Sequence, residues 1–245
     1  MIRHFIIMSS SYKQGKRIAL DYKGAQLTNA FLSQQIKIIK DQCGDDVSIS
    51  SHFIYAENES WAAVVKADSF FRGVYVTETL NGFIDLVKED LVLNGVDVAK
   101  YILSKTTCSH LRLQKLVYLA YADYLMLNGD QLFSDKILAY KYGPVVESVY
   151  KKYKNYGYSV INEENITQTD ALELPIRSRI LFSSNGIEKL TSIDNTLNRY
   201  GKFPVGKLVD ITHEEETPWR KTPQSEVIAD KTIYKYHINE LIITS

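Results

Sequence analysis

One predicted helix constrains the fold of this chain more than any other segment. It spans residues 110–128, with Ser109 placed to cap its start and Gly129-Asp130 to end it. Its apolar residues form two stripes on different sides, the first with Leu113, Leu116, Val117, Ala120, Tyr124 and Leu127, the second with Leu111, Tyr118, Tyr121 and Leu125. A helix that is apolar on two sides is either central to its domain or covered by a partner.

The charge balance argues against a nucleic-acid partner. The 245 residues contain 29 Lys and Arg and 29 Asp and Glu, and 45% of them are hydrophobic, as in a globular protein. Residues 1–95 hold 10 basic and 11 acidic side chains, and the remainder holds 19 and 18. Because neither half has the positive excess that phosphate binding requires, we expect no nucleic acid to bind.

The cysteines and the N-terminus indicate a cytoplasmic protein. Cys43 and Cys108 lie far apart without metal-ligand spacing, which is typical of single buried thiols in a reducing compartment. The apolar run Phe5 to Met8 is too short for a signal peptide or a membrane span. We therefore expect no membrane span, no metal and no cofactor.

The first 95 residues predict a small α/β-type module. We expect helices at residues 27–39 and 80–91, and strands at residues 5–8, 48–56, 61–66 and 73–77. Asn94-Gly95 is the best candidate for the junction with the next domain. The predicted domains are therefore residues 1–95 and 96–245.

The second domain is predicted to be mainly helical, which makes the chain α+β overall. Gly143-Pro144 predicts the start of one helix, because proline is tolerated at the first helical position. Residues 159–185 read as loops, and residues 226–243 fit either a helix or a strand. The predicted helices are residues 97–104, 110–128, 144–156, 187–200 and 204–212.

Two sites with catalytic potential are weak. The segment Ser10 to Arg17 follows a strand and contains Gly15-Lys16, but Ser10 and Arg17 replace two defining residues of a phosphate-binding loop. A nucleotide-binding enzyme is therefore an alternative, although a polar loop is preferred. His213 could be a catalytic base, although the sequence indicates no Ser, Cys or Asp partner for it. It is more typical of a residue that caps the preceding helix or forms a hydrogen bond near Trp219. We assign no catalytic residue.

Three blocks of sequence share a pattern with a known family. The first block is LRLQKLVY at residues 111–118. The second is Leu132-Phe133 with AYKYGPVV at residues 139–146 and Tyr150, where the family usually has Trp in place of Tyr140. The third is LVDITH at residues 208–213, followed by Pro218-Trp219. Over about residues 96–225 the chain resembles the Panacea domain, also called the SocA-like antitoxin domain.

The resemblance implies a mostly helical domain without known catalytic activity, which neutralises a toxin by binding it directly. The toxin would be encoded by the adjacent gene, and the resemblance implies nothing about residues 1–95. An alternative is a phage- or prophage-encoded adaptor or inhibitor that binds a host protease or defence factor. A homo-oligomer also remains open.

The matching blocks supply two sets of candidate residues. For Gln114 and Lys115, an internal bond and direct partner contact are both open, and the tyrosines are expected to divide between the core and an exposed patch. The partner-binding candidates are Gln114, Lys115, Tyr118, Tyr121, Tyr140, Tyr142, Tyr150 and Trp219. The residues expected to form the structural motif are Leu113, Leu116, Gly143, Pro144, Val145, Thr212, His213 and Pro218.

Overall fold

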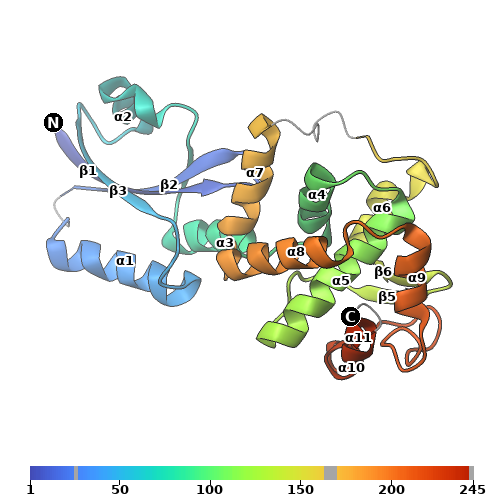
Figure 1. The fold of residues 1–245 in the computed structure, drawn as a ribbon. Helices are drawn as coiled ribbons and strands as arrows, with labels where there is room; N and C mark the ends of the chain where they lie inside the picture. The colour runs from blue at the N-terminus through green and yellow to red at the C-terminus, as the bar shows by residue number, and fades with distance from the viewer. Residues whose placement is uncertain (25–26, 163–169, 243–245) are drawn as a thin grey trace. The chain divides into compact units, whose positions relative to one another are not determined.

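The chain forms two compact units, each with a hydrophobic core of its own. The computed structural model describes residues 1–24, 27–162 and 170–242. The units are Met1–Val92 and Leu93–Ser245 (Figure 1). The first contains a four-stranded sheet with helices, and the second is mainly helical. The expected α+β class is therefore confirmed.

The first unit is built on a sheet with the strand order β3-β1-β2-β4. Strand β1 (Ile2–Ser11) pairs antiparallel with β2 (Lys16–Lys23) and with β3 (Ser50–Ala56), whereas the short β4 (Tyr75–Thr77) runs parallel to β2. Side chains alternate across β1, so Phe5 and Ile7 enter one core while Ile6 and Met8 enter another. Both faces of the central strand are therefore buried.

Helices cover both faces of this sheet. The core that contains Phe5 and Ile7 also includes residues of α1 (Asn29–Cys43) and α3 (Leu80–Leu91). The opposite core includes residues of α2 (Trp61–Ala67) and the short 3-10 helix η1 (Ser69–Phe71). Both predicted helices of this module are present.

One prediction for the first unit was wrong. Residues 61–66 form helix α2 instead of a strand, because the Ser60 side chain caps the helix by accepting the N–H of Ala63. The segment from Ser10 to Arg17 is the end of the β1–β2 hairpin, with a turn at residues 12–15 in which Gly15 takes a φ of 59°, as the preferred polar loop expected. A phosphate-binding loop leads from a strand into a helix, whereas a second strand follows here.

The second unit is assembled around α5 (His110–Asn128). Helix α4 (Gly95–Lys105) precedes α5 in the sequence. After α5 come the hairpin of β5 (Ile137–Tyr140) and β6 (Gly143–Val146) and then α6 (Glu147–Tyr153). The later elements are η2 (Lys154–Tyr156), α7 (Asp170–Leu181), α8 (Gly186–Tyr200), α9 (Val205–His213), α10 (Asp230–Tyr236) and α11 (Ile238–Ile242).

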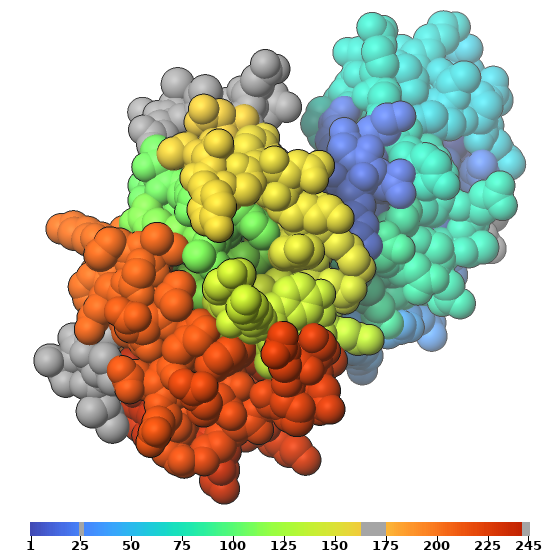
Figure 2. All heavy atoms as spheres, turned by 90° about the vertical axis from the view of Figure 1, so that its right-hand side faces the viewer, coloured from blue at the N-terminus to red at the C-terminus, as the bar shows by residue number. Residues whose placement is uncertain are grey.

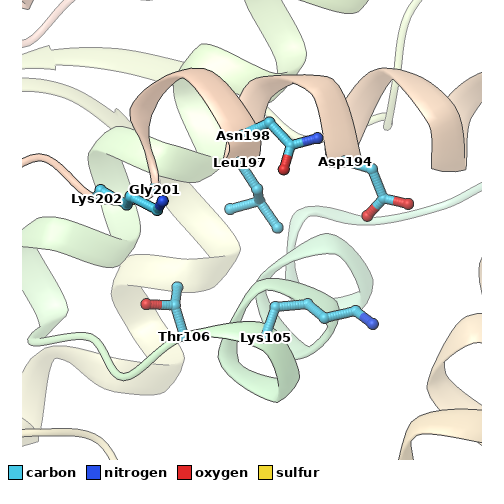
Figure 3. Close-up of a pocket in the computed structure, with 7 residues that line it drawn as sticks. All are labelled: Lys105, Thr106, Asp194, Leu197, Asn198, Gly201 and Lys202. Carbon is cyan, nitrogen blue, oxygen red and sulfur yellow. The ribbon is translucent and has the colours of Figure 1, made fainter.

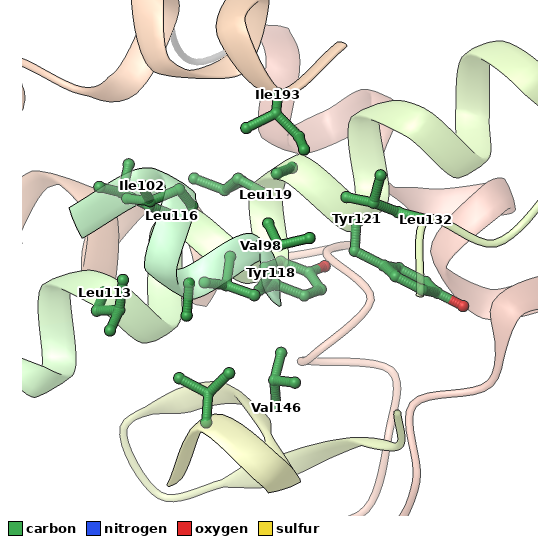
Figure 4. Close-up of a cluster of buried hydrophobic side chains, with 14 of the residues drawn as sticks. Val98, Ile102, Leu113, Leu116, Tyr118, Leu119, Tyr121, Leu132, Val146 and Ile193 are labelled. Carbon is green, nitrogen blue, oxygen red and sulfur yellow. The ribbon is translucent and has the colours of Figure 1, made fainter. Parts of the chain in front are cut away.

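Helix α5 is buried on every side over most of its length. Each residue from Leu113 to Leu125 is buried, and Leu116 and Leu119 are fully inaccessible. Its side chains meet Val98 and Ile102 of α4 and Ile193 of α8 in one core (Figure 4). The two apolar stripes therefore reflect a central helix, although Leu127 at the end of the first stripe is 68% exposed.

Three other predictions for the second unit were wrong. Gly143-Pro144 lies in β6, and the next helix begins only at Glu147, because Pro144 pairs with Ala139 across the hairpin. Helix α4 begins at Gly95, since Asn94 and Asp97 form a reciprocal cap. Residues 170–181, which were predicted to be a loop, form helix α7 despite Pro175, and Arg179 and Ile180 of this helix are buried. Residues 163–169 of the predicted loop lie outside the described residues.

The ambiguous tail is helical, as α10 and α11 show. Among the described residues, no helix combines the length and the apolar character needed to cross a membrane.

We predict that the two units unfold in separate transitions. Ile7→Ala, which deletes a fully buried side chain of the first unit, should lower the stability of that unit by about 2–5 kcal/mol. Leu116→Ala should do the same for the second unit only. Differential scanning calorimetry of both variants measures this, and a single transition that both variants shift equally would contradict independent units.

Candidate functional site

The three sequence blocks meet at the β5–β6 hairpin. Gln114 and Lys115 of α5 reach it from one side, and Trp219, which follows α9, reaches it from another. Figure 2 shows the yellow-green atoms of the hairpin between the yellow atoms of the α6 region and the orange-red atoms of the segment after α9. Segments that are distant in sequence therefore form one site.

Gln114 fixes the base of the hairpin. Its Oε1 accepts the Val146 N–H at 2.8 Å, and its Nε2 donates to the Val146 carbonyl at 3.4 Å. Gln114 is 1% exposed, so these groups have no access to bulk water. The Gln114 amide thus bonds Val146 as a neighbouring strand would, and both the N–H and the carbonyl of Val146 have a partner.

Lys115 fixes the turn of the hairpin. Its Nζ donates to the Tyr142 carbonyl and, at 3.4 Å, to the Pro144 carbonyl. The side chain is fully buried, and this burial lowers the pKa of the ammonium group to about 7, although the charge of Glu240 acts in the opposite direction. Gly143 allows this approach, because a Cβ at that position would collide with Nζ.

Trp219 and His213 support the other strand. Trp219 Nε1 donates to the Tyr140 carbonyl at 2.8 Å, and its ring lies 4.0 Å from the ring of His213, centroid to centroid. His213 Nδ1 lies 2.7 Å from the Val209 carbonyl, and burial lowers the pKa of its imidazole. His213 therefore ends α9 and supports Trp219, as the second and third interpretations of this residue expected.

The remaining residues of the structural motif are buried beside these contacts. Thr212 Oγ1 donates to the Leu208 carbonyl at 3.1 Å, and the Thr212 carbonyl accepts from Thr217 Oγ1 at 3.2 Å. The buried members are Leu113, Leu116, Gly143, Pro144, Val145, Thr212 and Pro218, whereas His213 is half-buried. This motif holds the hairpin against α5 and α9.

The structure divides the eight partner-binding candidates into two groups. Four lie in the core with exposures of 0–2%, so a partner has no access to them in this conformation: Gln114, Lys115, Tyr118 and Tyr121. For these four, partner contact is not supported, because each bonds inside the unit. The other four reach the surface. Tyr142 is 60% exposed, and Tyr140, Tyr150 and Trp219 are half-buried.

The four candidates that reach the surface lie on or beside the hairpin, and two of them are in ring contact. The rings of Tyr140 and Tyr150 meet edge to face at 5.5 Å, and the ring of His110 lies 5.3 Å from Tyr150. Lys141 and Tyr142 at the turn are exposed. We call Tyr140, Tyr142, Tyr150 and Trp219 the hairpin aromatic group.

A buried polar cluster lies on another side of α5, and sequence reasoning missed it. His237 is fully buried, with Nε2 2.8 Å from Asp123 Oδ1 and Nδ1 in contact with Glu240 Oε2. The Tyr118 hydroxyl donates to both Glu240 oxygens, at 3.0 and 3.1 Å. Sequence periodicity gave no signal for this cluster, because its members come from separate helices and from an ambiguous tail.

Sequence reasoning also missed a pocket of about 500 Å³ at the ends of α4 and α8 (Figure 3). It is lined by Lys105, Thr106, Asp194, Leu197, Asn198, Gly201 and Lys202. The Asp194 carboxylate accepts from the Tyr101 hydroxyl at 2.7 Å, and Arg112 donates to Thr106 Oγ1 and to the Gly201 carbonyl. Asp194, Thr106 and Gly201 of the pocket thus take part in bonds that connect the C-terminal ends of α4 and α8.

No metal centre is formed by the part of the chain that the structure describes, in which no three His, Cys, Asp or Glu residues are arranged to hold an ion.

We predict that Gln114→Leu destabilises the second unit by about 1–3 kcal/mol, because the buried N–H of Val146 loses its acceptor. The matched control is Gln224→Leu, at an exposed glutamine of the same unit, which should change stability by less than about 0.5 kcal/mol. Urea unfolding measures both. Equal effects of the two substitutions would contradict the role of Gln114.

Comparisons with known proteins agree with the geometry of the hairpin site. The family model described as "Antitoxin SocA-like, Panacea domain" matches residues 113–220, a range that starts in α5 and ends just after Trp219. Searches of curated proteins and of solved structures found no match. The matched range includes both the buried motif and the hairpin aromatic group. Residues 113–220 therefore match the SocA-like Panacea antitoxin domain.

Proposed function

We propose that this protein is the antitoxin of a toxin–antitoxin pair and neutralises its toxin by direct protein–protein binding. The Panacea domain supports an antitoxin-like role in general. The observation that carries the finer proposal is the hairpin aromatic group, whose backbone is fixed by bonds from Lys115 to Tyr142 and from Trp219 to Tyr140 while Tyr142 stays exposed. The cognate toxin is expected to be the product of the adjacent gene.

The hairpin aromatic group has the chemistry of a protein-binding surface. Tyrosine and tryptophan are frequent in the energetic centres of interfaces, because each buries a large ring and loses few rotatable bonds. Tyr142 is 60% exposed, while its own carbonyl is held by Lys115. A side chain on a fixed backbone loses less entropy on binding than one on a mobile loop.

We also propose that the protein acts without catalysis. Lys115 and His213 have the pKa shifts that are typical of reactive groups. Both are engaged in bonds that hold the fold, and Lys115 is inaccessible. Binding, and not turnover, is the activity that these contacts favour.

Co-expression with the adjacent gene tests the antitoxin proposal. We expect the neighbouring protein alone to arrest growth and the pair to restore it. A harmless neighbour, or a toxic one that this protein does not rescue, would contradict the proposal. Capture of a host protease or defence factor by the purified protein, with no binding of the neighbour, would favour the adaptor alternative.

We predict that Tyr142→Ala weakens toxin binding at least tenfold and leaves thermal stability nearly unchanged, because the ring is exposed. Tyr234→Ala is the matched control, since Tyr234 is 57% exposed on α10 and lies outside the hairpin. Calorimetric titration with the toxin measures the affinities. A loss of affinity for Tyr234→Ala alone would place the interface elsewhere.

A further inference from the structure

Helices α10 and α11 are attached to α5 largely through polar side chains. At the start of α10, Asp230 accepts from the Tyr121 hydroxyl and from Gln131 Nε2, both at 2.7 Å. At the junction with α11, His237 and Glu240 meet Asp123 and Tyr118 of α5. We call residues 230–242 the α10–α11 segment. Its apolar contacts with the core come from Ile233 and Leu241.

The buried cluster at the junction holds opposite charges at short distance. His237 lies between two carboxylates, Asp123 and Glu240, and all three are at most 4% exposed. Thr196 Oγ1 of α8 donates to the second oxygen of Asp123 at 2.6 Å. Arg199 of α8 reaches the first oxygen at 3.5 Å from a more exposed position.

The proton on the His237–Glu240 pair determines the charge of this cluster. Other titratable groups that act on it are Tyr118 and Lys115 from α5 and Tyr200 from α8. With the proton bound, the positive charges of His237 and Arg199 balance the carboxylates of Asp123 and Glu240. Without it, the buried carboxylates of Asp123 and Glu240 face a neutral ring. Buried charges without a partner are strongly destabilising, so loss of this proton weakens the attachment.

We propose that the α10–α11 segment is a pH-dependent switch: it separates from α5 as a unit when the His237–Glu240 pair loses its proton, while the rest of the second unit stays folded. The expected unit of opening is small, because α10 has seven residues and α11 has five. The surface that opening uncovers includes Tyr118, Tyr121 and Asp123 of α5. The switch is independent of the proposed antitoxin function.

The direction of the pH effect follows from the shift at His237. Burial alone lowers the pKa of the imidazole, but the hydrogen bonds and charges of Asp123 and Glu240 outweigh it and raise the pKa to about 9. The pKa of Glu240 is also raised, chiefly by burial. The closed segment therefore binds the proton more tightly than the open one. Its stabilising effect is complete below pH 6.5 and is lost as the pH rises through about 9.

Hydrogen exchange measured by mass spectrometry tests the switch on the unmodified protein. After correction for intrinsic rates, the opening equilibrium of residues 230–242 should increase about tenfold per pH unit between pH 6.5 and 9. Protection of α5 residues 113–117 and of α8 should persist over the same range. Equal loss of protection in all these helices, or no pH-dependent loss in residues 230–242, would overturn the proposal.

Two variants separate the proton from the helix itself. His237→Gln should give fast exchange in residues 230–242 already at pH 6.5 and should remove the slope with pH. Asn239→Ala is the matched control, because Asn239 donates from α11 to the exposed Glu216 carbonyl and has no titratable group. It should shift exchange by a constant factor and keep the slope. A retained slope in His237→Gln would contradict the role of the proton.

Discussion

Burial of α5 is the constraint on which the second unit depends. Every residue from Leu113 to Leu125 is buried, including Gln114, Lys115, Tyr118 and Asp123, whose polar groups must find partners inside the unit. Gln114 and Lys115 bind the hairpin, Tyr118 binds Glu240, and Asp123 binds His237 and Thr196. Each of these four residues of α5 thus fixes the position of another element.

This arrangement separates the residues that build the Panacea domain from those that reach its surface. The buried motif occupies α5, β6 and the segment from α9 to Pro218, and beside it Gln114 and Lys115 of α5 and Trp219 after α9 bond to the hairpin from two sides. The hairpin in turn exposes Tyr142, while Tyr140 and Tyr150 pack against each other beside it. A substitution in the motif is expected to act through stability, whereas a substitution at the tip acts on the surface only.

The sequence predicted elements well where local signals were strong. Helices α3 and α5 have capping residues at their starts and periodic apolar faces, and both lie at the expected residues. The signals failed where a short segment fits two structures. Gly143-Pro144 suits a helix start as well as a hairpin strand, and residues 61–66 are apolar enough for a strand, although Ser60 caps a helix. In these segments, strand pairing or a helix cap determines the secondary structure.

The candidate site was only partly predictable for a related reason. The three blocks meet at the hairpin, but periodicity placed Gln114 and Lys115 on a strip whose environment remained open. Only the fold shows that β6 lies over that strip and buries both side chains. The cluster around His237 was not predictable, because its carboxylates come from α5 and α11 and no local pattern relates them.

The proposed function requires that the surface around the exposed Tyr142 contacts the protein partner. Site-specific photo-crosslinking tests it most directly, with a benzoylphenylalanine placed at position 142 and, in a separate protein, at position 234. We expect a covalent adduct with the toxin from position 142 and none from position 234 when the pair is co-expressed. A toxin adduct from position 234, with none from position 142, would contradict it.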